Sequence, residues 1–249
     1  MTSKLYGIGV GPGDPELLTI KAKNILERVD IIYTPVSKKN RDSKALSIIS
    51  EVIDLKNKRI EKLLFPMVNK IQIKKKYWHK NSRKIKSDLK NDLEAAFITI
   101  GDPMLYSTYI NILNNLNNKF PEIKIETIPG ITSINAASAR YNIPLAQKNE
   151  KLMVLPEIPD ISCLENIIEE FDNIVVLKIS KNYNKLIKML TNFGLKDEFV
   201  FISKCGYSEE FITNDIKTLK NKEIEYLSLV ICKQGKDVSQ YISVLSKDL

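Results

Sequence analysis

The stretch FITIGDPMLYSTY, residues 97–109, joins an apolar, β-branched run to a segment of helical character through the turn Gly101-Asp102-Pro103. This order predicts a buried strand, a turn and a helix, and open α/β sheets place their ligands at such turns. Gly101 permits an unusual φ, while Pro103 fixes its own φ and keeps Asp102 out of the α region. We therefore expect Asp102 to present its carboxylate beside the strand end, for a ligand or as an ordinary helix cap.

The composition is typical of a globular protein without a membrane span. The 249 residues are 43% hydrophobic and 27% charged, and no run reaches the roughly 18 apolar residues of a transmembrane helix. The N-terminus has no secretory signal pattern. Three widely spaced cysteines without a CxxC pair favour free thiols and argue against a zinc site. We expect a cytoplasmic protein with no metal centre and no membrane partner.

Much of the net charge of +8 falls in one basic segment, residues 70–90. Lys74, Lys75, Lys76 and Lys80 are grouped there around Tyr77-Trp78-His79. One interpretation is a solvated helical face. The other is an electrostatic attractor for a polyanion, either nucleic acid or a small molecule with several carboxylates. Composition does not decide between the two.

The first 36 residues predict a βαβ unit. A strand over 4–10 runs into a glycine loop, a helix follows with Asp14 as its cap and Pro15 at its first position, and a second strand covers 30–36. The loop departs from the dinucleotide fingerprint GxGxxG, because Pro12 stands where the third glycine belongs. A Rossmann NAD site is therefore not expected, and the chain has no GxxxxGK[ST] phosphate loop.

The rest of the chain predicts further alternation of strands and helices. The expected strands are 59–65, 95–100, 123–128, 151–155, 173–179, 199–204 and 226–232. The expected helices are 43–52, 69–93, the segment after Gly101-Asp102-Pro103, the small-residue segment around 136–139, then 163–171, 181–192 and 209–218. The Asn-rich stretch 114–118, which Pro121 follows, is the predicted junction between domains 1–117 and 118–249.

Three loops follow predicted strands: GPGDP at 11–15, GDP at 101–103 and PGITS at 129–133. In this order, the runs GxGxGPGDPELLT, GDPxxY and PGITS resemble the tetrapyrrole (corrin/porphyrin) methyltransferase family, over essentially the whole chain. The resemblance implies a kinked two-domain α/β fold, with a mixed sheet flanked by helices in each domain. It also implies S-adenosylmethionine (SAM) as methyl donor in the cleft between the domains, and a homodimer.

A closer resemblance is to the branch that methylates C-20 of precorrin-2 or cobalt-factor II in cobalamin biosynthesis. It is carried by residues 97–109, 128–133, 144–146 and 149–156, and by Phe65-Pro66-Met67. The continuation MLYSTY after GDP argues against the uroporphyrinogen-III, ribosomal RNA and diphthamide-pathway enzymes of the same fold. An RNA-binding module that uses the basic segment is a further alternative, but it leaves the three loops unexplained. Any cobalt would belong to the substrate, and the motifs do not tell whether it is present.

The resemblance also assigns residues to the two ligands. The implied SAM-binding set is Pro12, Gly101, Asp102, Pro103, Leu105, Tyr106, Thr132, Ser133 and Lys178. The implied substrate-binding set is Gly11, Gly13, Asp14 and Thr34. Thr34 stands where relatives acting on uroporphyrinogen-III carry an acid, so no acid–base role is expected there.

The catalytic group that removes the C-20 proton is not identified by the sequence. Tyr33, Tyr106, Asp14 and Glu150 are candidates, whereas His79, the one histidine, is more typical of a surface residue. The ring acetates and propionates of the implied substrate offer a rationale for the basic segment 70–90, which we expect to attract them.

Overall fold

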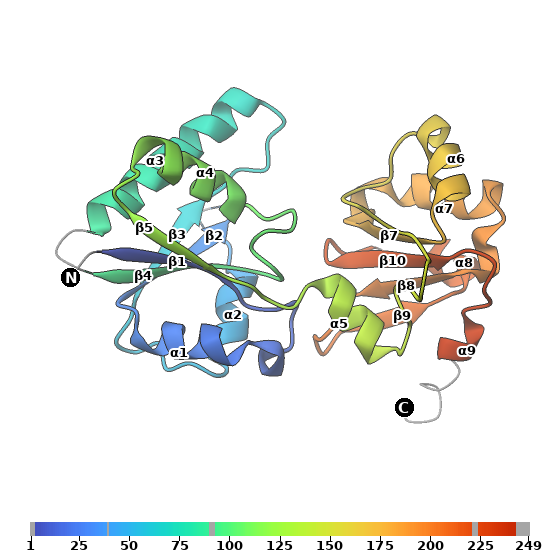
Figure 1. The fold of residues 1–249 in the computed structure, drawn as a ribbon, viewed down its shortest axis with the longest axis horizontal. Helices are drawn as coiled ribbons and strands as arrows, with labels where there is room; N and C mark the ends of the chain where they lie inside the picture. The colour runs from blue at the N-terminus through green and yellow to red at the C-terminus, as the bar shows by residue number, and fades with distance from the viewer. Residues whose placement is uncertain (1–2, 39, 90–92, 221–223, 243–249) are drawn as a thin grey trace. The chain divides into compact units, whose positions relative to one another are not determined.

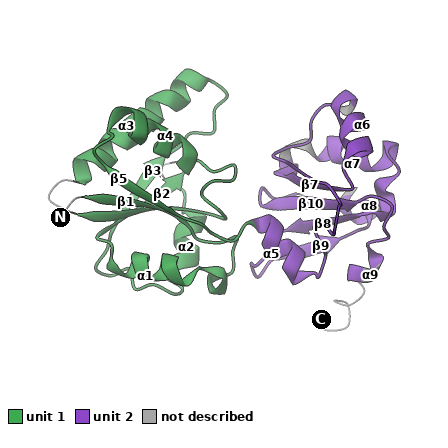
Figure 2. Ribbon diagram, viewed as in Figure 1, with its two compact units in different colours: residues 1–132 green, residues 133–249 purple. Residues whose placement is uncertain are grey.

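The computed structural model describes residues 3–38, 40–89, 93–220 and 224–242. The chain divides into two compact units, residues 1–132 and 133–249 (Figure 2). The predicted boundary after residue 117 lies too early, because the strand that follows it, β5 (Lys124–Ile128), pairs with β1 (Lys4–Gly9) in the first sheet. Each unit is an α/β structure with its own core, and each is described separately below.

Unit 1 contains a five-stranded sheet in the order β3-β2-β4-β1-β5. Its other strands are β2 (Ile31–Val36), β3 (Arg59–Leu64) and β4 (Glu94–Thr99). All described pairings in this sheet are parallel, as the βαβ pattern predicts. The expectation of a mixed sheet in each domain therefore holds only in unit 2.

Helices cover both faces of this sheet (Figure 1). The helices α1 (Ile20–Arg28) and α2 (Lys44–Ser50) pack on one face, while α3 (Ile71–Asp88) and α4 (Tyr109–Lys119) pack on the other. Along β4, Ala96 and Ile98 join the first core cluster and Ala95 and Phe97 the second, because successive strand side chains point to opposite faces. A sheet covered on both faces needs such continuous apolar strands.

The single helix predicted after Asp14 is two elements. Asp14 caps a short 3-10 turn, Pro15–Leu17, by accepting a hydrogen bond from the Glu16 amide at 2.8 Å. Leu18 then returns to extended backbone, and Thr19 starts α1 anew by accepting from the Ala22 amide at 3.2 Å. Two capping residues in series divide the segment, since each cap requires non-helical backbone at its own position.

Unit 2 contains a mixed sheet in the order β6-β7-β10-β8-β9. The pair β6–β7 is parallel and the other pairs are antiparallel. The strands are β6 (Leu152–Leu155), β7 (Asn173–Leu177), β8 (Phe199–Ser203), β9 (Phe211–Thr213) and β10 (Ser228–Lys233). The helices are α5 (Ser133–Arg140), α6 (Ile161–Glu170), α7 (Tyr183–Asn192), α8 (Ile216–Lys220) and α9 (Ser239–Ile242), with 3-10 turns Ile179–Asn182 and Leu195–Asp197.

The helix predicted over 209–218 is wrong in its first half. Phe211, Ile212 and Thr213 form the edge strand β9, with Ile212 opposite Ile202 of β8. These are an aromatic and two β-branched residues, which favour a strand. The three cysteines are free thiols, as expected. Within the described ranges, no helix is long and apolar enough to cross a membrane.

Candidate functional site

The three glycine loops meet at the carboxyl edge of the unit 1 sheet. They follow β4, β1 and β5, which are adjacent parallel strands, so their ends lie at one edge. The Gly101 amide donates a hydrogen bond to the Gly11 carbonyl at 2.7 Å, and these two glycines form an isolated bridge beyond the strands. Both have positive φ, +83° at Gly11 and +68° at Gly101, which glycine adopts without steric cost.

The backbones of Gly9, Gly101 and Gly130 approach one another so closely that a side chain at Gly9 or at Gly130 would collide with them. A Cβ at Gly9 would lie 2.7 Å from the Gly130 nitrogen and closer still to the Gly101 carbonyl oxygen. A Cβ at Gly130 would lie 2.8 Å from the Gly9 Cα. By contrast, a Cβ at Gly101 would meet its nearest neighbour, the Ile131 carbonyl oxygen, at 3.9 Å. The edge is therefore closely packed at Gly9 and Gly130, whereas a Cβ at Gly101 would make only ordinary van der Waals contacts.

Asp102 joins two of these loops through its carboxylate. One oxygen accepts a hydrogen bond from the Met104 amide at 2.7 Å, and the other accepts from the Gly130 amide at 3.0 Å. The first bond shapes its own loop, as a capping side chain does. The second fixes that loop to the residues that follow β5. The carboxylate lies beside the strand end as predicted, and it holds the loops together.

The loop after Pro103 projects apolar side chains into solvent. Met104, Leu105 and Tyr106 are exposed, and Tyr106 has a positive φ of 50°, which is uncommon for a residue other than glycine. Ser107 anchors the far end of the loop, because its hydroxyl contacts the Thr99 hydroxyl at 3.0 Å and accepts from the Tyr109 amide at 3.1 Å. A loop anchored at both ends can offer an apolar surface to a ligand at little conformational cost.

The remaining predicted residues of unit 1 fall into two groups. Pro12, Gly13 and Asp14 continue the loop after β1 at the same edge, and Asp14 serves as the cap described above. Thr34 is fully buried within β2, where its hydroxyl pairs with that of Ser43. Ser43 is also the cap of α2. The structure thus gives Thr34 a partner inside the core, which a buried hydroxyl requires.

Gly9 and Gly130 are absent from the predicted set although the edge depends on them. For Gly9 the available signal was the pair Gly7-x-Gly9 within the first strand, because glycine in a strand marks a close approach of another backbone or of a ligand.

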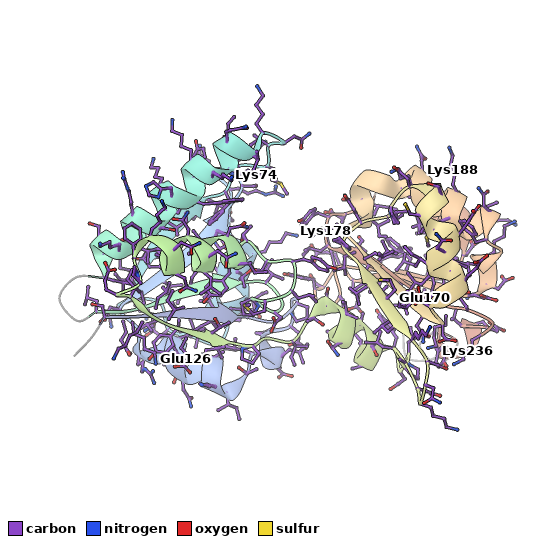
Figure 3. The ribbon with its side chains drawn as sticks, turned by 45° about the horizontal axis from the view of Figure 1, so that its top comes forward. Lys74, Glu126, Glu170, Lys178, Lys188 and Lys236 are labelled. Atoms are coloured by element: carbon purple, nitrogen blue, oxygen red, sulfur yellow. The ribbon has the colours of Figure 1, made fainter. Side chains whose placement is uncertain are left out.

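Ser133 and Lys178 belong to unit 2. Ser133 is the first residue of α5, and Lys178 directly follows β7 with a left-handed φ of 55° (Figure 3). Burial lowers the pKa of the Lys178 ammonium, although Glu157 opposes this shift.

Two of the candidate proton acceptors are engaged elsewhere. The Tyr33 hydroxyl donates to Asp88 at 3.0 Å in the core beside α3, and burial raises the pKa of Tyr33 far above its ordinary value. Hydrogen bonds from Lys236 and Asn173 lower the pKa of Glu150 to about 2. A buried phenol and a strongly acidic carboxyl are both poor general bases near neutral pH.

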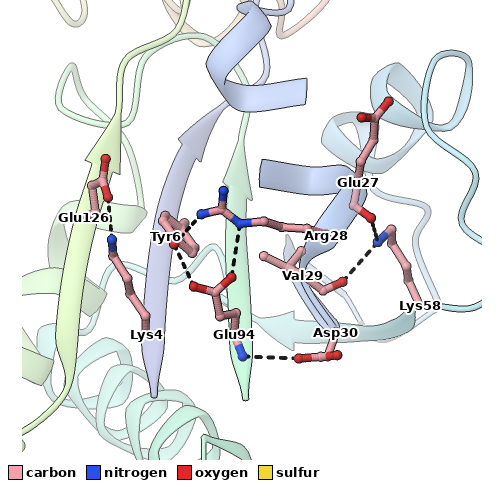
Figure 4. A network of polar contacts seen from close by, with 9 residues as sticks. All are labelled: Lys4, Tyr6, Glu27, Arg28, Val29, Asp30, Lys58, Glu94 and Glu126. Atoms are coloured by element: carbon pink, nitrogen blue, oxygen red, sulfur yellow. Dashed lines mark hydrogen bonds and ion pairs between the residues drawn. The ribbon is translucent and has the colours of Figure 1, made fainter. Parts of the chain in front are cut away.

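The amino edge of the unit 1 sheet has a different chemistry (Figure 4). The Tyr6 hydroxyl donates to Glu94 at 2.8 Å, and Arg28 donates both to that hydroxyl at 2.6 Å and to the Glu94 carboxylate at 3.1 Å. Glu126 accepts from Lys21 at 2.5 Å and from Lys4 at 2.6 Å, which lowers the pKa of Glu126 to about 2. These charges compensate one another.

No group of three or more His, Cys, Asp or Glu side chains among the described residues is arranged to hold a metal ion.

Comparison with known proteins gives consistent results. Residues 4–220 match the family described as tetrapyrrole (corrin/porphyrin) methylases. The chain is 40% identical, over 95% of its length and 98% of the relative, to a probable cobalt-precorrin-2 C(20)-methyltransferase of Methanocaldococcus jannaschii. It is 30% identical, over 82% of its length and 85% of the relative, to the cobalt-precorrin-2 C(20)-methyltransferase of Salmonella typhimurium.

Solved structures with the same fold include a cobalt precorrin-4 methyltransferase, with a TM-score of 0.70, 20% identity and coverage of 93% of this chain and 95% of that one. The uroporphyrin-III C-methyltransferase of Thermus thermophilus, solved as a complex with S-adenosylhomocysteine, has a TM-score of 0.64, 18% identity and coverage of 97% and 99%.

Proposed function

The chain belongs to the tetrapyrrole (corrin/porphyrin) methylase family, and from this premise we propose that it transfers a methyl group from SAM to C-20 of cobalt-precorrin-2. The observation that carries the proposal is the 40% identity, over nearly the whole of both chains, to a relative named for that reaction. A relative named for the cobalt-free substrate, from Sinorhizobium, is 28% identical. The cobalt-bearing form is therefore the preferred substrate of the proposal.

The carboxyl edge of unit 1 is the proposed SAM site. At this edge the loop carries exposed Leu105 and Tyr106, and the backbones of Gly9 and Gly130 pack directly together. A site of this kind fits a ligand with a flat base, a polar sugar and an apolar methyl group. Bound SAM supplies an electrophilic methyl group on a sulfonium. Pro12, Pro103 and Thr132 complete the proposed set in unit 1, and the family resemblance implies Ser133 and Lys178 of unit 2 as further SAM-binding residues.

The protein's contribution to the reaction is alignment. Transfer of a methyl group to carbon is an in-line displacement, and holding two reactants in line is worth about 7–11 kcal/mol of the barrier. Asp102 acts as a positioning residue in this proposal, because its two hydrogen bonds set the loop that carries Leu105 and Tyr106. Leu105 and Tyr106 would exclude water from the transferred group. We further propose that the chain acts as a homodimer in the cytoplasm, as members of the family usually do.

A single-turnover assay tests the proposal. The enzyme is mixed under anaerobic conditions with SAM and either cobalt-factor II (cobalt-sirohydrochlorin), as the cobalt-bearing substrate, or metal-free precorrin-2. Mass spectrometry counts the added methyl groups and NMR locates them. The expected result is one methyl at C-20 of the cobalt form. Binding of S-adenosylhomocysteine without turnover of either tetrapyrrole would refute the substrate while leaving the family intact.

A further inference from the structure

The helix α3 is longer than the sheet that it covers. The Asn81 side-chain amide donates to the carbonyl of Leu64, the last residue of β3, at 3.0 Å, so Asn81 lies level with the end of that strand. Asn81, Ser82 and Ile85 are buried, whereas no residue from 71 to 80 is. We call residues 71–80 the α3 overhang. At the rise of an α-helix it extends roughly 15 Å beyond the level of Asn81.

The overhang lies at the same edge and on the same face as the apolar loop of the candidate site. It follows β3, whose carboxyl end lies at the edge where the glycine loops meet. The helices α3 and α4 lie side by side (Figure 1). The helix α4 begins directly after residues 104–107. The two features therefore flank one region of unit 1.

One stripe of the overhang continues the face by which α3 packs on the sheet. Ile71, Lys74 and Trp78 precede Ser82 and Ile85 at helical spacing, so they share this inward face. Trp78 still packs against the core, but nearer the start of the helix the stripe loses its cover, and Ile71 is 45% exposed. Met67, in the connection from β3, is 60% exposed. An apolar stripe without a core beneath it indicates a ligand or a partner.

Lys74 is the cation of this stripe, near the N-terminal end of α3 (Figure 3). Helical side chains lean toward the helix N-terminus, which carries the Lys74 ammonium away from the sheet. Lys76 is two residues further on, about 200° around the helix, and lies on the opposite face. No ion pair involves Lys74, Lys75, Lys76 or Lys80 among the residues that the structure describes.

We propose that the α3 overhang binds the tetrapyrrole substrate, with Met67 and Ile71 against the ring and Lys74 paired with one of its carboxylates. The inference rests on the proposed function, since it requires a substrate that is both apolar and polyanionic. An apolar stripe with one inward ammonium complements such a ring, and the other lysines of the overhang attract its charge from a distance. In this proposal Lys74 pairs directly with a substrate carboxylate, whereas the outward-facing lysines of the basic segment only increase the rate at which the anionic substrate approaches.

The test compares Lys74→Gln with Lys76→Gln, a matched loss of one charge from the opposite face. Binding of cobalt-sirohydrochlorin and of S-adenosylhomocysteine is titrated separately for each variant and for the unsubstituted protein. We expect Lys74→Gln to weaken tetrapyrrole binding about tenfold, with Lys76→Gln changing it less than twofold. Binding of S-adenosylhomocysteine is unchanged in both. Ile71→Ser should also weaken tetrapyrrole binding, and far-UV circular dichroism verifies that each variant is folded.

Equal effects of Lys74→Gln and Lys76→Gln, or no effect of either, would overturn the inference while the unsubstituted protein still binds tetrapyrrole. Failure of the unsubstituted protein to bind any tetrapyrrole would instead refute the proposed substrate and the inference with it. A labelled single-stranded oligonucleotide is titrated in parallel. If it binds through Lys74 and the tetrapyrrole does not, the surface serves nucleic acid and the inference is wrong.

Discussion

The two edges of the unit 1 sheet are built from different kinds of interaction. The amino edge is held by hydrogen bonds between side chains, in which Glu94 accepts from Tyr6 and Arg28 and the Tyr6 hydroxyl also accepts from Arg28. At the carboxyl edge, glycine backbones pack directly together, Asp102 binds two backbone amides, and apolar side chains remain exposed. The first edge has its polar groups satisfied within the protein. The second has surface left over for a ligand. Substitutions at the amino edge should therefore change the free energy of unfolding alone, whereas substitutions at the carboxyl edge should also change the affinity for S-adenosylhomocysteine.

The largest effect is expected from Gly130→Ala. The new methyl group would meet the backbones of Gly9 and Gly101, neither of which can move without distorting the sheet. We expect the free energy of unfolding to fall by about 1–3 kcal/mol and the affinity for S-adenosylhomocysteine to fall at least tenfold. Denaturant titration and calorimetry measure the two quantities.

The matched control for Gly130→Ala is Gly194→Ala in unit 2. Gly194 has a φ of +71° but nothing within 4 Å of the added methyl group, so only backbone strain of about 1–2 kcal/mol is expected there. Binding of S-adenosylhomocysteine should be unchanged. An equal loss of binding in both glycine variants would show that the effect follows from general destabilisation.

Next in size is Asp102→Ala, which leaves the Met104 and Gly130 amides without their acceptor. We expect about a tenfold loss of affinity for S-adenosylhomocysteine, equal to about 1.4 kcal/mol. Asp102→Asn keeps one side-chain oxygen that can accept a hydrogen bond from a backbone amide, so its loss of affinity for S-adenosylhomocysteine should be smaller. If both variants bind as tightly as the unsubstituted protein, the carboxylate has no part in positioning the loop.

At the amino edge, Tyr6→Phe removes the hydroxyl between Arg28 and Glu94. The expected cost is about 1 kcal/mol in the free energy of unfolding, the usual worth of such a hydrogen bond. Affinity for S-adenosylhomocysteine and single-turnover methylation should match the unsubstituted protein. A loss of turnover without a loss of stability would contradict the separation of the two edges.

The smallest effect is a dependence of stability on pH at Glu126. Its pKa in the folded protein is about 2, below the ordinary value of 4.5, because Lys21 and Lys4 donate hydrogen bonds to it. The stability that it contributes is complete above pH 4.5 and is lost as the pH falls toward 2. Denaturant titrations across this range should show Glu126→Gln less stable than the unsubstituted protein above pH 4.5, with the difference shrinking toward pH 2. A difference that stays constant with pH would exclude this ionisation as its cause.

Much of the fold followed from local pattern. Apolar runs that lead into glycine loops predicted three strands of unit 1, apolar runs alone predicted the other two, and the order of strand, helix and strand predicted their parallel pairing. Local reasoning was wrong where two signals competed, as at Asp14 and Thr19, or where a three-residue edge strand lay inside a helix-like segment, as at Phe211–Thr213. The predicted helix over 69–93 is confirmed as Ile71–Asp88, and its residues 90–92 lie outside the described ranges.

The candidate site was predictable as a set of loops but not as a set of contacts. The carboxylate of Asp102 was expected beside the strand end, yet its bond to Gly130 joins residues 28 positions apart and depends on the order of strands in the sheet. Thr34 is a case where the sequence suggested too much. A hydroxyl near a strand end is a plausible ligand contact, but in the structure Ser43 packs against Thr34 and the side chain is fully buried. The α3 overhang could not be predicted from the sequence either, because it depends on how far the helix extends past the end of β3 in the folded protein.

Hydrogen–deuterium exchange with and without saturating S-adenosylhomocysteine tests the central claim most directly, because it reads both edges of the same sheet in one experiment. The account predicts slower exchange in peptides covering residues 99–108 and 129–132, with unchanged exchange at the start of β1 and β4. Protection confined to the amino edge, or no protection of residues 99–108 by the bound ligand, would contradict it.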